Sequence, residues 1–165
     1  MTDIYDNYAN EELSAGKATE AVNVSGNKVV HMLQTIAIAP SHGAGAVYRL
    51  FRIGANMIPL DVKVLCSAVT GAADCDIGLY EEGVKGKALA ADILADGLTL
   101  ATATGITSPL NGLKSLSLDN VGKRIYELAG HSRNKKDTGY DVCLTANSAA
   151  TAAGKAVVIA TFVQG

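Results

Sequence analysis

Two runs of sequence decide the fold of this chain: VKVLCSAVT at residues 62–70 and DCDIGLY at residues 74–80. In an extended backbone successive side chains point to opposite faces. Every second residue from Val62 to Ala68 is apolar, and the same holds from Cys75 to Leu79. Both runs therefore predict half-buried strands, and Gly71-Ala72-Ala73 between them predicts a tight turn.

The same alternation predicts strands along most of the remaining chain, at residues 28–39, 47–53, 139–146 and 155–163. The last of these is apolar on both faces, which is typical of a strand inside a sheet. Residues 88–103 fit extended structure with a turn at Asp96-Gly97. In the strand at 47–53, strict alternation sets Val47, Arg49, Phe51 and Ile53 on one face.

One helix is expected, from Asp119 to Ala129. Asp119 or Asn120 can cap its start, and Gly130 suits its end. Its apolar side is formed by Val121, Ile125 and Leu128. Short strands, Gly-rich turns and one small helix predict a mainly β fold, an antiparallel β-sandwich or jelly roll.

Composition limits the classes of partner. The 165 residues suit one β-sandwich domain, at residues 28–165, preceded by an extended N-terminal arm at residues 1–27. A net charge of −2, with neither sign concentrated, argues against nucleic acid. No apolar run is long enough for a membrane-spanning helix, so we expect no membrane partner.

The N-terminal arm is polar and mildly acidic, without a helical or strand period. It carries Tyr5 and Tyr8, and an aromatic ring with a polar tip suits an interface. We therefore interpret Tyr5 and Tyr8 as interface residues. The alternative is a disordered tail.

No group of residues matches a catalytic or metal-binding pattern. The chain has no G-x-S-x-G motif, and its three histidines lie far apart in sequence: His31, His42 and His131. The cysteines lack C-x-x-C spacing and fall on apolar strand faces, as buried hydrophobes do: Cys66, Cys75 and Cys143. We predict no catalytic residue, no metal and no cofactor, leaving open whether Asp74 and Asp76 bind an ion.

Four segments in order along the chain, DCDIGLY at 74–80, DILADG at 92–97, VGKRIYELAG at 121–130 and YDVCLT at 140–145, resemble small virion proteins of tailed phages. Within that class they are most similar to head decoration, or cement, proteins with a jelly-roll sandwich. The resemblance spans roughly residues 45–165 and rests on strand and turn patterns without an invariant chemical signature.

The resemblance implies a non-enzymatic bacteriophage structural protein that binds the outer capsid surface and cements neighbouring capsid subunits. Its partners would be the major capsid protein and copies of itself, as a dimer or trimer. It would assemble in the host cytoplasm and reside on the capsid exterior. The alternatives are a low-copy tail or connector component of the virion, and a carbohydrate-binding β-sandwich module.

Overall fold

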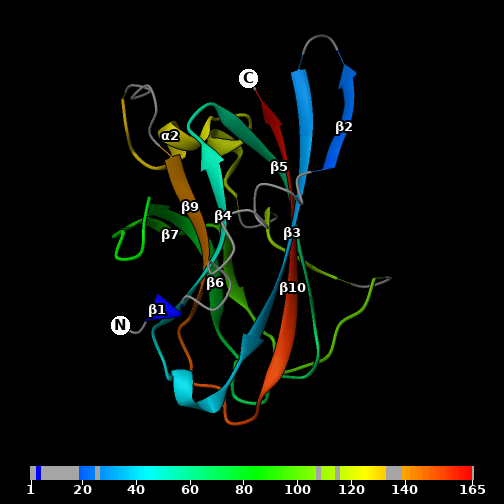
Figure 1. Ribbon diagram of the computed structural model, residues 1–165, viewed down its shortest axis with the longest axis vertical. Helices are drawn as coiled ribbons and strands as arrows, with labels where there is room; N and C mark the ends of the chain where they lie inside the picture. Colours follow the sequence, from blue (N-terminus) through cyan, green and yellow to red (C-terminus); the bar gives the residue numbers. More distant parts are fainter. Residues whose placement is uncertain are drawn as a thin grey trace.

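The computed structural model describes residues 3–4, 19–24, 27–106, 109–113, 116–132 and 139–164. Two five-stranded sheets face each other (Figure 1). Sheet A has the order β1 (Asp3–Ile4), β4 (Ala46–Gly54), β9 (Gly139–Ala146), β6 (Cys75–Glu81) and β7 (Ala88–Leu98). Sheet B has the order β2 (Thr19–Val24), β3 (Asn27–Ile38), β10 (Gly154–Gln164), β5 (Met57–Cys66) and β8 (Leu110–Asn111).

The strand order is that of a jelly roll. Without β1 and β2, the sheets are β4-β9-β6-β7 and β3-β10-β5-β8, and the chain passes repeatedly from one sheet to the other. All pairs are antiparallel except β1 with β4. The predicted mainly β sandwich of jelly-roll type is thus confirmed.

The two runs quoted at the outset are strands, but they lie in different sheets. Residues 62–66 end β5 in sheet B, whereas residues 75–80 belong to β6 in sheet A. The connection between them crosses the end of the sandwich, where Val69 N donates to Leu100 O at 2.8 Å and Leu100 N to Ala72 O at 2.8 Å. The segment after Cys66 is therefore a crossing between sheets, and the predicted strand ends four residues early.

The core lies between the inner faces of the two sheets. Strand β10 is placed between β3 and β5, as its sequence predicts, and its inner residues are fully buried: Ala156, Val158, Ala160 and Phe162. Alanine at several inner positions keeps the layer thin, while Phe162 fills the space next to the partly buried Met32 and Met57. This interdigitation follows the period-two pattern of the strands.

A bulge changes the predicted faces of β4. The pairing of β4 with β9 shifts register between Arg49 and Phe51. Val47 and Arg49 therefore point away from the core, whereas Phe51 and Ile53 point into it. An extra residue in one strand reverses the alternation from that point on, so the single-face prediction for Val47–Ile53 is wrong.

The predicted turn at Asp96-Gly97 is also a bulge. Strand β7 continues through both residues to Leu98, and between the pairs Cys75–Leu98 and Ile77–Ala95 two residues of β7 oppose one of β6. Gly97 has φ +64°, the left-handed conformation that suits glycine at a bulge. The extended prediction holds for residues 88–98 only.

The helical prediction was too long. Its region forms η3 (Leu118–Asn120) and a single α-helical turn, α2 (Ile125–Leu128). Gly122 between them has φ +80°, which interrupts a helix, and Val121 is 63% exposed instead of buried. Arg124 is the N-cap residue, with its N–H bonded to Glu127 Oε2 at 2.8 Å, while Ile125, Leu128 and the Gly130 end agree with the prediction.

Candidate interaction surface

The two tyrosines predicted to form an interface, Tyr5 and Tyr8, lie outside the described residues. Two parts of the predicted arm are strands: β1 pairs with β4, and β2 pairs with β3 across the predicted boundary after residue 27. The role of the tyrosines stays a prediction.

Of the two aspartates considered for ion binding, Asp76 forms side-chain hydrogen bonds within the sandwich, and Asp74 forms backbone hydrogen bonds to Asn147 and Ser148. Asp76 Oδ1 accepts a hydrogen bond from Gly97 N at 3.0 Å, and Oδ2 accepts one from Asn147 Nδ2 at 2.6 Å. The charge of Asp76 is also the main cause that raises the pKa of Asp96. In the described ranges no three His, Cys, Asp or Glu side chains are grouped as metal ligands. The Asp76 side chain thus connects β6 to the β7 bulge and to the turn after β9.

Each histidine hydrogen-bonds a hydroxyl group in a different part of the fold. His31 Nδ1 lies 3.0 Å from Thr161 Oγ1, and His131 Nδ1 lies 2.6 Å from Tyr140 Oη. His42 Nδ1 lies 2.9 Å from Tyr48 Oη, whose pKa is raised to about 12, mainly by burial. The bonds of His42 and His131 connect segments outside the sheets to strands, the bond of His31 connects β3 to β10, and none of them includes a serine or cysteine within the described part of the chain.

The three cysteines are buried and form no disulfide with one another, as predicted for Cys66, Cys75 and Cys143. Burial, with the nearby charges of Asp74 and Asp76 as lesser causes, raises the pKa of the Cys75 thiol to about 12. A thiol of that pKa is almost entirely protonated at neutral pH and is a poor nucleophile.

A buried ion pair lies on the outer face of sheet A. Arg49 on β4 and Asp141 on β9 are 1% and 0% exposed, and Arg49 Nη1 lies 2.9 Å from Asp141 Oδ2. Arg49 also donates to the carbonyl oxygens of Glu81 at 3.3 Å and Gly86 at 2.9 Å, and its guanidinium lies 5.8 Å from the centre of the Tyr80 ring. The pair therefore anchors the β6–β7 connection to the sheet.

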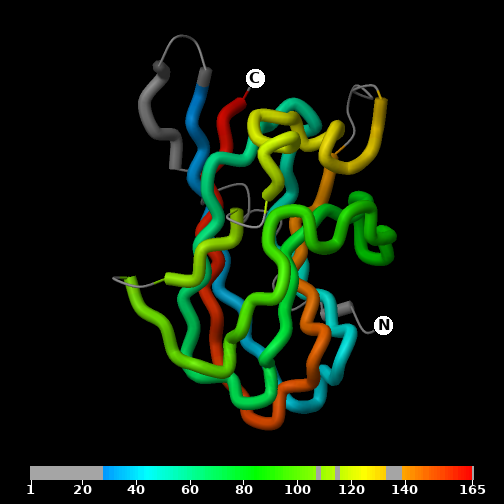
Figure 2. Tube along the Cα trace, turned by 180° about the vertical axis from the view of Figure 1, so that it is seen from behind, coloured from blue at the N-terminus to red at the C-terminus, as the bar shows by residue number. Residues whose placement is uncertain are grey.

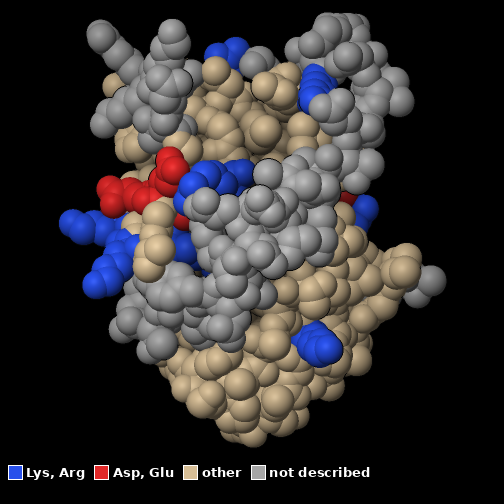
Figure 3. Space-filling view, in the orientation of Figure 1, with Lys and Arg blue, Asp and Glu red and all other residues tan. Residues whose placement is uncertain are grey.

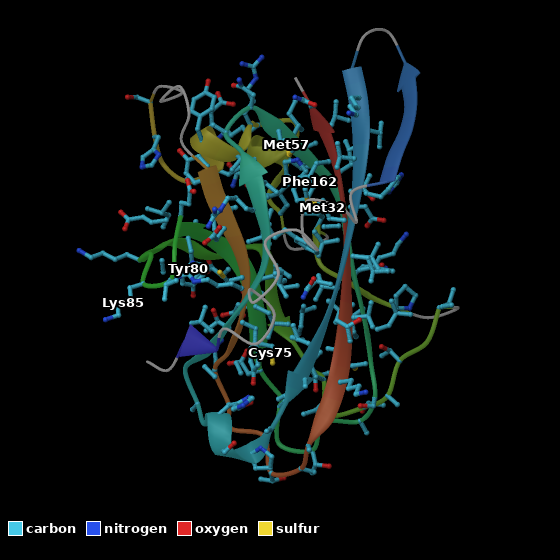
Figure 4. The ribbon with its side chains drawn as sticks, in the orientation of Figure 1. Met32, Met57, Cys75, Tyr80, Lys85 and Phe162 are labelled. Carbon is cyan, nitrogen blue, oxygen red and sulfur yellow. The ribbon has the colours of Figure 1, made fainter. Side chains whose placement is uncertain are left out.

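The surface around this connection is charged. Figure 3 shows acidic and basic side chains gathered on one side of the molecule at mid-height, and Figure 4 places Lys85 there, pointing away from the body. Glu82, which is 43% exposed, pairs with Arg52 at 3.1 Å. Opposite charges thus alternate here, and the patch has no strong single-sign field.

The outer face of sheet B is apolar. Across β3, β10 and β5 it presents Leu33, Val157, Ile159 and Leu65, and Leu33 is 43% exposed. It carries three charged residues on β5 and β10: Lys63 and Asp61 pair with each other, with Nζ to Oδ2 at 2.7 Å, and Lys155 lies exposed at the start of β10. An apolar sheet face whose central charges are paired has the character of a protein interface.

The outer face of sheet B contains a hollow of about 390 Å³. Its floor is formed by Lys63, Leu65, Asn111 and Ile159, and its wall by Ile106 and Pro109. These last two belong to the connection from β7 to β8, which projects from the side of the sandwich in both views (Figures 1 and 2). Ile106 is 89% exposed, so the wall itself carries an apolar tip.

The fold is similar to that of chains from two phage capsids. A chain in the capsid of Ralstonia phage GP4 matches with a TM-score of 0.59 and 16% identity, over 92% of this chain and 94% of that one. A chain in the capsid asymmetric unit of cyanophage Pam1 matches with a TM-score of 0.55 and 14% identity, over 88% of this chain and 91% of that one. No protein-family model matches the chain, and no curated protein matches its sequence at a significant level.

These matches show a shared fold, since the sequence identity is low. The coverage is nearly complete in both directions, so a jelly roll of this size forms almost the whole of each matched chain. The likeness to phage head proteins inferred from strand and turn patterns is therefore supported at the level of the fold. Separately, the described residues include no helix long and apolar enough to cross a bilayer.

Two features of the surface were not predicted from the sequence. The outer face of sheet B could have been found, because Leu33, Leu65 and Ile159 fall on the faces opposite the predicted core positions. The Arg49–Asp141 pair could not, because its members are 92 residues apart in sequence.

Proposed function

We propose that this chain is a non-enzymatic structural protein of a phage virion, which binds the outer surface of the capsid and cements neighbouring capsid subunits. One observation carries the proposal: the jelly roll matches chains of two phage capsids over nearly the full length of both partners. A decoration protein of this kind acts in the virion, on the capsid exterior, after assembly in the host cytoplasm.

The described surface is consistent with this role. Large apolar side chains are exposed at several separate places, including Leu33 and Leu60 in sheet B, Ile106 beside the hollow, and Leu118 and Val121 before α2. Scattered apolar contacts of modest size give weak binding at one site, but binding becomes strong when many copies engage a repeating lattice. The major capsid protein and further copies of this chain are the partners that such a lattice supplies.

The copy number in purified virus particles tests the proposal. Quantitative mass spectrometry should give this chain in a simple ratio to the major capsid protein. A handful of copies per particle would indicate a tail or connector component instead. Absence from particles would refute the virion role and favour a carbohydrate-binding module.

The N-terminal segment supplies a second test. We propose that Tyr5 and Tyr8 contact a neighbouring subunit, so Tyr5→Ala combined with Tyr8→Ala should weaken binding to capsids that lack this protein. The melting temperature should stay within a degree or two of the parent chain. Unchanged capsid binding would show that these tyrosines are not the interface.

A further inference from the structure

A projection and a hollow lie in one row across the outer face of sheet B. Leu33 on β3, Ile159 on β10 and Lys63 on β5 are direct neighbours in register, and Asn111 on β8 follows Lys63. Leu33 projects on one side of β10 and is 43% exposed. The hollow of about 390 Å³ opens on the other side, between Ile159 and Asn111.

This arrangement is self-complementary. Neighbouring strands are about 4.8 Å apart, so Leu33 lies one strand from β10 and the hollow lies one to two strands away in the opposite direction. A two-fold axis running close to β10, between two facing sheets, exchanges these two sides. We propose that two copies of this chain pair through the outer face of sheet B, with Leu33 of each copy seated in the hollow of the other.

The same two-fold axis also brings titratable side chains of the two copies together. The next row contains His31 on β3, Thr161 on β10 and Asp61 on β5. The rotation that seats Leu33 also brings the His31 imidazole of each copy over the Asp61 carboxylate of the other. Within one copy these two residues are separated by two strand spacings, about 10 Å.

The cost of covering this face is small. Lys63 and Asp61 already neutralise each other, and the remaining charged side chain, Lys155, lies at the end of β10, four residues from the row of Ile159, so pairing over the central rows does not bury an isolated charge. The outer face of sheet A offers no comparable contact, because Val47, Arg49 and Cys143 are at most 1% exposed there. Strand addition is disfavoured at two edges: β8 has two residues, and β7 is bulged and carries Asp92 and Asp96.

The size of the face sets the strength of the pair. Three strands over about eight residues cover on the order of 400 Å² per copy, half of what a stable complex buries on each partner. We therefore expect a dissociation constant in the micromolar to millimolar range. The pair forms in concentrated solution and is reinforced where copies are held side by side.

Sedimentation velocity of the full chain from about 10 μM to 1 mM tests the proposal. The weight-average mass should rise from monomer towards dimer. Leu33→Asp should weaken pairing at least about 100-fold, because each dimer loses two buried leucines. The control Leu118→Asp alters a residue that is 92% exposed in η3 and should leave pairing unchanged. A monomer at 1 mM, or equal weakening by both variants, would overturn the proposal.

A charge exchange tests the orientation. His31→Asp alone should weaken pairing by placing two carboxylates in contact, and adding Asp61→His should restore it. Restoration requires that the two residues meet between copies. Failure to restore, in variants that melt like the parent, would reject the axis along β10. The proposed pairing rests on the sheet geometry and is tested with isolated protein. It can therefore be wrong while the virion role is right, and it can be right while the virion role is wrong.

Discussion

Replacement of Asp141 by alanine should destabilise the sandwich by about 3–5 kcal/mol, the usual cost of leaving one member of a buried ion pair alone. Asp141 is fully buried and Arg49 is 1% exposed, with 2.9 Å between Nη1 and Oδ2. The same carboxylate accepts hydrogen bonds from Arg52 Nε at 3.3 Å and Gly83 N at 3.0 Å. The substitution therefore removes these three interactions and leaves a buried cation.

The remaining contacts of Arg49 place the expected loss near the lower end of that range. Its guanidinium keeps the carbonyl oxygens of Glu81 and Gly86 as acceptors, which compensate part of the desolvation. Its Nε is buried without a hydrogen-bond partner in the described part of the chain, so the compensation is already incomplete in the parent. Because Nε lacks a partner in both the parent and the variant, it does not add to the loss expected for the substitution.

Urea unfolding measures the effect. With a slope of about 2 kcal/mol/M, a loss of 3 kcal/mol or more lowers the midpoint by roughly 1.5 M or more. Arg52→Ala is the matched control, because Arg52 contacts the same carboxylate but is 36% exposed, and it should cost about 1 kcal/mol or less. Replacing both partners, as Arg49→Met with Asp141→Leu, should recover most of the stability.

Two results would refute this reasoning. The first is a loss below about 1 kcal/mol for Asp141→Ala, which would mean that Arg49 finds solvent or another partner. The second is a double variant as unstable as Asp141→Ala alone, since an apolar pair leaves no charge to desolvate.

Three further predictions follow from other parts of the fold. Gly78→Ala should cost several kcal/mol in the same assay, because a Cβ there would overlap the β7 backbone, whereas Gly54→Ala, with open space around it, should be nearly neutral. Asp96→Asn should raise the melting temperature at pH 7: the pKa of Asp96 is raised mainly by Asp76, so repulsion is present above that pKa and disappears on protonation. The gain should therefore vanish near pH 3.5, and a constant gain would contradict the assignment. Ellman's reagent at pH 8 should not react with Cys75 in the folded chain and should react after denaturation, because the thiol is buried with a pKa raised to about 12.

Much of the strand layout could be predicted from the sequence. Residues 28–39, 139–146 and 155–163 alternate or are continuously apolar, and each is a strand within a residue or two of the expected bounds. The predictions failed where one residue was added to a regular pattern. The β4 bulge after Arg49 reversed the faces, and the β7 bulge at Gly97 was interpreted as a turn.

The pairing between strands could not be predicted from the sequence, for a physical reason. The alternation of residues in a strand indicates which face is buried, but it does not indicate which strand pairs with it. For this reason β5 and β6 could not be assigned to different sheets. The same limit applies to the candidate surface. The row that joins Leu33, Ile159 and Lys63 exists only because β3, β10 and β5 are adjacent.

The central positions of β9 and β10 affect how the chain is made. Strand β9 joins β4 to β6, and β10 joins β3 to β5, yet both are synthesised after all the strands that they connect. Until residues 139–164 leave the ribosome, β4 and β6 lack the strand that joins them, as do β3 and β5, and neither layer can close. Closure of the sandwich therefore depends on pairings between strands far apart in sequence, which slows folding, and a product terminated before Gly139 lacks the strand that joins the two halves of each sheet.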